Sequence, residues 1–170
     1  MQYLLLFLLC LSSVRSSMAE DAEAARIRQK LNSIPMMQKV QLSENEWRKI
    51  LTPTQFLVLR EAGTEPPFKN EYANNHEKGT YLCAACDNEL FGSNTKFESG
   101  TGWPSFYAPL APNKITVSMD RSGGMKRQEV RCARCGSHIG HVFKDGPPPT
   151  HLRYCLNSAA LKLVRTTKGR

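Results

Sequence analysis

Four of the six cysteines stand in two Cys-x-x-Cys pairs, Cys83 with Cys86 and Cys132 with Cys135. This is the spacing of a tetrahedral four-thiolate zinc site, in which each pair offers both sulfurs from one tight turn. Because the pairs are far apart in the sequence, one shared ion would join two distant hairpins, and such a closed site is structural. Disulfides are the alternative, since small secreted domains often depend on them. Two thiols on one tight turn suit a metal better than a cross-link between distant segments.

The rest of the chain is typical of a small, mainly β domain. A chain of 170 residues with 41% hydrophobic residues can build one ordinary core, so we expect one domain. After Pro67 the sequence consists of short segments separated by Gly, Pro, Asn and Asp. Residues 115–119 and 128–131 alternate between faces as antiparallel strands do, and residues 120–124 predict the hairpin turn between them. The fold class is therefore mainly β, formally α+β.

Two short helices are predicted before the β region. Ser43 and Glu46 have the spacing of a capping box at the start of the first helix. The second is predicted over residues 54–62, with Gly63 as its stop. We expect both helices to pack against a sheet and to carry no chemistry.

The first 19 residues are typical of a secretory signal peptide. Residues 3–11 form an apolar run too short to span a bilayer, followed by small residues up to Ala19. We expect cleavage after Ser16 or Ala19 and residence in the secretory pathway, in the endoplasmic reticulum or outside the cell. The alternatives are a mitochondrial transit peptide and a cytosolic form that starts at Met18. Residues 20–41 predict a flexible segment, 42–164 the folded domain and 165–170 a basic tail.

The charge pattern limits the classes of partner. The formal net charge is +8, but the basic residues are scattered and form no stripe with aromatic residues. We therefore expect no nucleic-acid partner. Because the apolar run is confined to the leader, we also expect no permanent membrane span. Nothing in the sequence favours an obligate oligomer, so we expect a monomer.

One cysteine remains outside the two pairs once Cys10 leaves with the leader, and that is Cys155. If residues 153–158 form a strand, Arg153, Cys155 and Asn157 point to one face while the apolar side chains point to the other. The arginine would favour the thiolate, which is the reactive form of the thiol. The alternative is a buried structural cysteine, because free cysteine is among the most buried residue types.

Two histidines and one tryptophan are further candidates. His138 and His141 could transfer protons near neutral pH, bind a second metal, or be structural. Trp103 lies in a loop between turn-forming residues, with Gly102 before it and Pro104 after it. A core tryptophan is the usual interpretation, but the flanking residues favour an aromatic side chain held at a binding site.

Taken together, these motifs resemble the B-type methionine sulfoxide reductases. The resemblance runs from about Trp47 to Leu163 and rests on five segments in order, namely Cys83-x-x-Cys86, Ser99–Phe106, Cys132-x-x-Cys135-Gly136, His138-x-Gly140-His141-Val142-Phe143 and Arg153–Ser158. It implies two antiparallel sheets with one structural zinc ion. It also implies reduction of the R epimer of methionine sulfoxide in oxidised proteins, with thioredoxin or another thiol as reductant.

The resemblance also implies roles for single residues. Cys155 would attack the sulfoxide sulfur as a thiolate, and His141 or His138 would protonate the departing oxygen. Trp103 would receive the methyl group of the sulfoxide, with Phe143 as a second substrate-binding residue. Arg153 would favour the thiolate, and Asn157 would position the site by hydrogen bonding. The products would be methionine and a sulfenic acid on Cys155.

The sequence departs from the common pattern of that family at Thr101, where many members have a resolving cysteine. With four thiols on zinc, no mature cysteine is free for that role, so an external thiol is expected to attack the sulfenic acid. Two other classes of protein stay open. A zinc-ribbon binding module would not need Cys155, and a thiol/disulfide oxidoreductase would use one of the Cys-x-x-Cys pairs.

Overall fold

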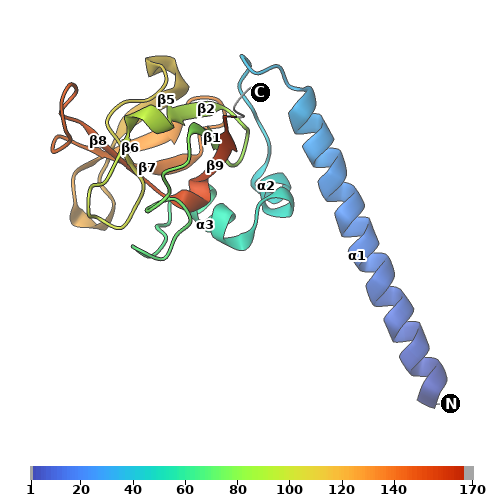
Figure 1. Cartoon of the computed structure of the whole chain (residues 1–170). Helices are drawn as coiled ribbons and strands as arrows, with labels where there is room; N and C mark the ends of the chain where they lie inside the picture. The colour runs from blue at the N-terminus through green and yellow to red at the C-terminus, as the bar shows by residue number, and fades with distance from the viewer. Residues whose placement is uncertain (1, 167–170) are drawn as a thin grey trace.

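The computed structural model describes the backbone of residues 2–166 and the side chains of residues 18–166, and it shows two antiparallel sheets with three α-helices in that part of the chain (Figure 1). The predicted mainly β class is thereby confirmed. The strands are β1 (Gly79–Cys83), β2 (Glu89–Gly92), β3 (Lys96–Phe97), β4 (Ser105–Phe106), β5 (Ile115–Asp120), β6 (Arg127–Cys132), β7 (His138–Phe143), β8 (Arg153–Leu156) and β9 (Leu161–Arg165).

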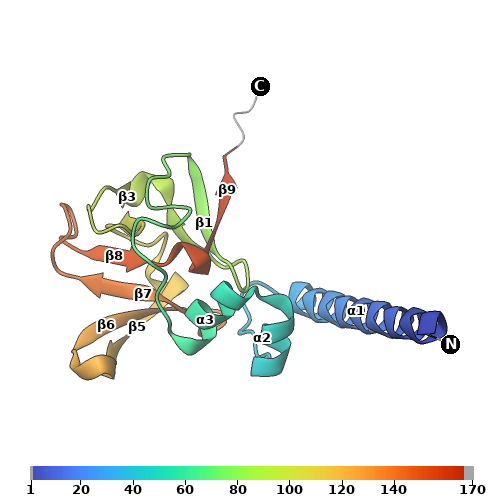
Figure 2. The same ribbon diagram turned by 90° about the horizontal axis from the view of Figure 1, so that it is seen from below.

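The strand order places β8 inside the larger sheet. The three-stranded sheet has the order β2-β1-β9, and the six-stranded sheet has the order β3-β4-β8-β7-β6-β5. The predicted hairpin between β5 and β6 is present (Figure 2), but residue 120 still belongs to β5 and the connection includes a short 3-10 turn over Ser122–Gly124. Because β8 pairs with both β4 and β7, the backbone on either side of Cys155 is held by neighbouring strands.

The core between the sheets is an aromatic cluster. Tyr81 of β1 meets Phe106 of β4 edge to face, with ring centroids 5.0 Å apart. Phe91 of β2 meets Tyr154 of β8 at 5.5 Å. Aromatic pairs at such distances add to the stabilisation from buried apolar area. Since Tyr154 and Leu156 face this core, Cys155 faces the other side of its strand, and the predicted alternation is confirmed.

The two predicted short helices are also confirmed. Helix α2 (Glu44–Ile50) begins with the capping box of Ser43 and Glu46, and α3 (Pro53–Glu61) begins with a second box at Thr52. The buried apolar face of α3 packs against β7 and the turn after β8. The left-handed residue that ends α3 is Ala62, with φ of 54°, rather than the predicted Gly63.

Helix α1 (Gln2–Ser33) includes residues 20–33 of the segment over 20–41 that the sequence predicts to be flexible. Its C-terminal part packs on α2, where Ile27 and Leu31 are buried and Arg28 donates to the carbonyl of Ile50 at 2.6 Å. These few apolar residues are enough to hold the helix because α2 provides a surface on which they pack. The sequence alone does not show this packing. The N-terminal part of α1 extends away from the sheets (Figure 1). Among the residues described, no helix has the length and apolar content needed to cross a membrane.

Candidate active site and metal centre

The four paired cysteines form one buried cluster. Their sulfur atoms all lie within 4.8 Å of one another, with 3.7 Å between Cys83 and Cys135 and 3.6 Å between Cys86 and Cys132. A zinc–sulfur bond of about 2.3 Å corresponds to a tetrahedral edge of about 3.8 Å, whereas a disulfide requires about 2.05 Å. The residues therefore fit a four-thiolate metal site and not two disulfides.

Both knuckles have the same backbone geometry, which explains how distant segments present their thiols alike. The amide of Asp87 donates to the carbonyl of Cys83, and the amide of Gly136 donates to the carbonyl of Cys132, each at 2.9 Å. Asp87 and Gly136 are left-handed, with φ of 58° and 71°. Asn88, which follows the first knuckle, donates to the carbonyl of Lys114 at 3.0 Å.

The sulfurs of the cluster change one another's pKa through their hydrogen bonds. Hydrogen bonds with neighbouring sulfurs, that with Cys132 first, raise the pKa of Cys83 well above its usual value. The hydrogen bond with Cys135, followed by that with Cys83, lowers the pKa of Cys132. A cation that binds all four sulfurs as thiolates would displace the protons that the metal-free thiols carry. The buried Arg134 adds a positive charge and donates to the carbonyls of Cys86 and Ile34.

A second site surrounds Cys155. Its half-buried thiol lies at a shallow cleft of about 120 Å³. The residues around this cleft come from β6, β7, β8 with the residue that follows it, and the loop before β4, and they include Trp103, Arg127, His141, Phe143, Cys155 and Asn157. The structure thus brings four predicted catalytic or substrate-binding residues to the same cleft as Cys155.

Strand register explains why His141 and Cys155 meet. Cys155 is the cross-strand partner of His141 on β7 and of Ser105 on β4, and His141 is in turn the partner of Glu129 on β6. Directly opposed residues in antiparallel strands share one face of the sheet. Gly140 makes the close approach possible, because a Cβ at this position would lie 2.2 Å from the carbonyl oxygen of Cys155.

The two predicted histidines have different surroundings. His141 lines the cleft, and its Nε2 lies 2.9 Å from Asp120 Oδ2. His138 is buried, with Nδ1 at 2.7 Å from Glu129 Oε1, and its pKa is lowered by burial against the opposing effect of that carboxylate. The rings of the two histidines meet edge to face at 5.3 Å.

The alternative of a second metal at these histidines finds no support in the described residues. Only the cysteine cluster brings three or more His, Cys, Asp or Glu ligand atoms within reach of one ion there.

Trp103 is held in place through Glu65. The indole Nε1 donates to the carbonyl of Glu65 at 3.0 Å, while the amide of Glu65 donates to Asn157 Oδ1 at 3.1 Å. The buried carboxylate of Glu65 accepts from the amides of Ser158 and Ala159. Residue 65 therefore joins the loop of Trp103 to the end of the strand that carries Cys155.

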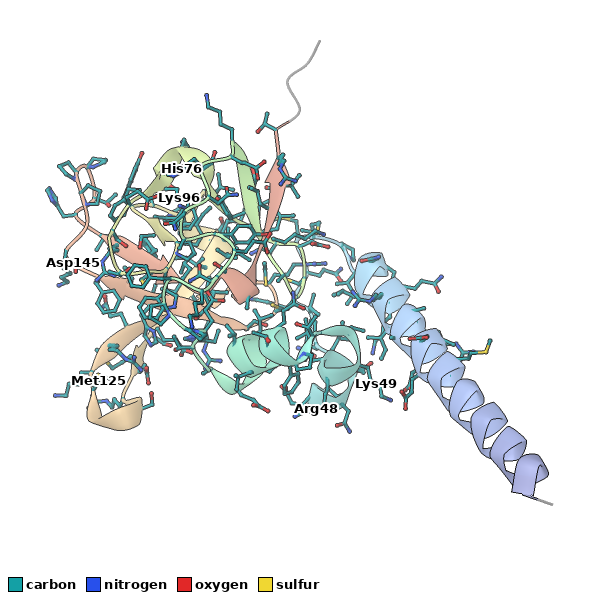
Figure 3. The ribbon with its side chains drawn as sticks, turned by 60° about the horizontal axis from the view of Figure 1, so that its bottom comes forward. Arg48, Lys49, His76, Lys96, Met125 and Asp145 are labelled. Carbon is teal, nitrogen blue, oxygen red and sulfur yellow. The ribbon has the colours of Figure 1, made fainter. Side chains whose placement is uncertain are left out.

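Arg153 is oriented by two partners. It donates to both carboxylate oxygens of Asp145, at 2.9 and 2.7 Å, and its guanidinium lies 4.4 Å from the centre of the Phe143 ring. Asp145 lies in the loop between β7 and β8 (Figure 3). The pKa of Arg153 is raised first by Asp145 and to a lesser extent by Cys155. The hydroxyl of Thr101 lies 3.8 Å from Cys155 Sγ.

Four polar residues around the cleft were not singled out in the sequence as site residues. These are Glu65, Asp120, Arg127 and Glu129. The sequence predicts residue 120 to lie in a turn and residue 129 to lie in a strand. The available signal was the alternation along residues 128–131, which places Glu129 on one face of the strand, but alternation does not tell which strand pairs with it.

The sequence matches the SelR domain over residues 51–165. It is also similar to proteins named peptide methionine sulfoxide reductase MsrB. The relative from Methanosarcina barkeri is 55% identical over 136 residues, which cover 79% of this chain and 96% of the relative. The relative from Agrobacterium fabrum is 55% identical over 123 residues, or 72% and 91% of the two chains. The relative from Leptospira interrogans is 53% identical over 130 residues, or 76% and 99%.

Proposed function

Because the chain belongs to the SelR-domain family of MsrB peptide methionine sulfoxide reductases, and so is an oxidoreductase, we propose that it reduces the R epimer of methionine sulfoxide in proteins. The observation that carries this proposal is the placement of Cys155 at a cleft between Trp103 and His141. A nucleophile, a proton donor and an apolar surface for the substrate methyl group are thereby within one small site.

In the first step the thiolate of Cys155 attacks the sulfoxide sulfur, and the oxygen ends on Cys155. His141 supplies the proton that the oxygen takes up, so the products are a thioether and a sulfenic acid. His141 is favoured over His138 for this role because His141 lines the cleft, whereas His138 is buried behind it. In the second step a reductant thiol attacks the sulfenic sulfur and water leaves. A second thiol then releases the mixed disulfide and regenerates Cys155.

Two aromatic side chains can bind the apolar part of the substrate. Trp103 is fixed by its hydrogen bond to Glu65, and Phe143 is fixed by the guanidinium of Arg153. A methyl group against the indole would leave the sulfoxide oxygen on the side of His141 for one epimer only. Asn157 holds the Glu65 backbone and thereby the indole, which is a positioning role.

Turnover of separated epimers tests the proposal. With a peptide that contains one methionine sulfoxide and dithiothreitol as reductant, we expect the R epimer to be reduced and the S epimer to persist. Product formation is followed by chromatography of the two peptide forms. Equal turnover of both epimers would contradict the selectivity. Turnover of neither by folded, metal-loaded protein would contradict the reductase function itself and favour a metal-binding module.

We further propose that an external thiol regenerates Cys155 directly, because the residue of the Ser99–Ser105 loop that lies 3.8 Å from its sulfur is Thr101, which has no thiol. The variant Thr101→Cys tests this. After one turnover without reductant, we expect the wild type to keep a sulfenic acid that dimedone traps. We expect the variant to form a disulfide between residues 101 and 155. The Thr101 hydroxyl lies 3.8 Å from the sulfur of Cys155, and a modest shift would bring a thiol at position 101 within bonding distance.

Peptide mapping by mass spectrometry distinguishes these products, and Thr101→Ser is the matched control. Dimedone trapping alone in the cysteine variant would show that residue 101 cannot reach Cys155. A disulfide between Cys155 and a cluster cysteine in the wild type, with loss of metal, would contradict the proposal. It would show that a thiol of the protein itself, and not an external thiol, attacks the sulfenic acid.

The remaining features of the proposal rest on composition and sulfur chemistry. The buried cluster is assigned one structural zinc ion, since four thiolates in a tetrahedral arrangement are its preferred ligands. The apolar leader supports a signal peptide and a place in the secretory pathway. There the protein would repair oxidised proteins during oxidative stress as a monomer, with thioredoxin or another dithiol protein as reductant.

A further inference from the structure

The geometry points to Asp120 as a positioning residue for His141, an inference that rests on the function proposed above. Asp120 is the last residue of β5 and does not line the cleft, so it would act only through the histidine. Neither the alternation of the strands nor the comparisons with known proteins assign it a role.

The carboxylate of Asp120 is held on three sides. Its Oδ1 accepts from the amide of Ser122 at 2.8 Å. Its Oδ2 accepts from Arg127 Nη2 at 2.8 Å and lies 2.9 Å from His141 Nε2. The side chains of Asp120 and His141 are only 14% and 12% exposed. Hydrogen bonds from Ser122, followed by that from His141, hold the pKa of Asp120 well below its usual range. Asp120 is therefore a fixed negative charge at neutral pH.

The β5–β6 hairpin places the carboxylate of Asp120 next to His141, although β6 lies between their strands. Asp120 is paired with Arg127 at the turn end of the β5–β6 hairpin, and the turn that joins the two strands carries Met125, which is labelled in Figure 3. His141 lies on β7, on the other side of β6. His141 thus has Cys155 as its neighbour on β8 and the carboxylate of Asp120 on the side of β5. The arrangement places the imidazole between the reacting sulfur and a fixed anion.

This contact fixes both the ring and its proton. When Nε2–H donates to Asp120, Nδ1 is the ring nitrogen left to carry a second proton, and a carboxylate stabilises the resulting imidazolium. In the reaction this proton goes to the sulfoxide oxygen. The imidazolium becomes neutral imidazole while the Cys155 thiolate becomes a sulfenic acid, so charge and atoms balance. The other charged or titratable groups that face His141 are Glu129 and Arg127 on β6, His138 on β7, and Cys155 with Arg153 on β8.

The test compares Asp120→Asn with the wild type in the peptide assay across pH. We expect kcat to fall about 10- to 100-fold, which is part of the 10²–10⁴-fold effect of a positioned general acid. KM should change little, since Asp120 does not line the cleft. The pH profile of kcat should also change in the variant, because the imidazole loses the carboxylate that contacts its Nε2 at 2.9 Å.

The second arm is a double-mutant cycle with His141→Asn. If Asp120 acts through the histidine, Asp120→Asn should have almost no further effect on kcat in that background. An equal loss in both backgrounds would overturn the inference, as would an unchanged kcat in the single variant. The exposed, matched controls Glu61→Gln and Arg121→Gln should keep wild-type kcat. If Asp120→Asn does not fold, Asp120→Glu, which retains the charge but displaces it, should show the same shift of kcat with an unchanged KM.

A readout without turnover separates this inference from the function on which it rests. We expect the Nε2 proton of His141 to give a hydrogen-bonded signal in nitrogen-edited NMR of the wild type and to lose it in Asp120→Asn. A wild type that shows the signal but reduces neither epimer would refute the proposed function alone. A wild type that reduces the R epimer without that signal would refute the role of Asp120.

Discussion

Replacement of Cys155 by serine is expected to abolish reduction of the R epimer, by about 10⁴-fold or more. The substitution keeps the size and the half-buried position of the side chain in β8. A serine hydroxyl is a far weaker nucleophile than a thiolate. It also cannot take up the sulfoxide oxygen, whereas the cysteine thiolate does so and becomes a sulfenic acid. Because Tyr154 and Leu156, and not Cys155, face the core, we expect no loss of stability.

Three measurements on the same preparation make this result interpretable. Peptide turnover gives the activity, the thermal unfolding midpoint reports the fold, and the metal content reports the cysteine cluster. Wild-type stability and metal content with no turnover would assign the chemistry to Cys155. Turnover retained in the serine variant would mean that another thiol is the nucleophile.

Loss of one cluster cysteine is expected to destroy the fold itself. In Cys132→Ser, a buried site keeps three thiols, and we expect no bound metal and a protein that is insoluble or unfolded at 25 °C. A structural zinc contributes about 10–16 kcal/mol in zinc-finger peptides, whereas a whole domain is stable by about 5–15 kcal/mol. The cluster joins the turn after β1 to the turn after β6, so its loss separates two parts of the core.

Circular dichroism and metal analysis check this expectation, with Ala133→Ser in the same knuckle as the matched control. Treatment of the wild type with a strong chelator should reproduce the unfolding. A Cys132→Ser protein that keeps its unfolding midpoint but loses activity would support the alternative of a thiol/disulfide oxidoreductase that uses a Cys-x-x-Cys pair.

The parts of the fold that the sequence predicts are those with local signals. The capping box at Ser43, the alternation around Cys155 and the turn at 120–124 each depend on a few neighbouring residues. The two Cys-x-x-Cys pairs extend this to long range, because one ion needs all four thiols. These features are sufficient to predict the class of the fold and the location of the cluster.

The parts that could not be predicted depend on strand pairing. Asp120 and Glu129 meet the two histidines only because β5, β6 and β7 are neighbours in a particular register, which alternation does not specify. The burial of Leu31 could not be predicted for the same reason, because it depends on where α2 packs against α1. The sequence predicts that Arg153 favours the thiolate of Cys155. In the structure its guanidinium donates two hydrogen bonds to Asp145, eight residues earlier in the sequence.

The insertion of β8 between β4 and β7 has a consequence for the order in which the chain can fold. All four cluster cysteines precede Cys155 in the sequence, so the metal centre can close while β8 and β9 are still unpaired. Strand β9 must then pair with β1, which lies near the other end of the domain, and such non-local pairing forms slowly. When the chain follows this order, the Cys155 thiol joins the sheet after the four cluster thiols are held together, so none of them is free to form a wrong disulfide with it.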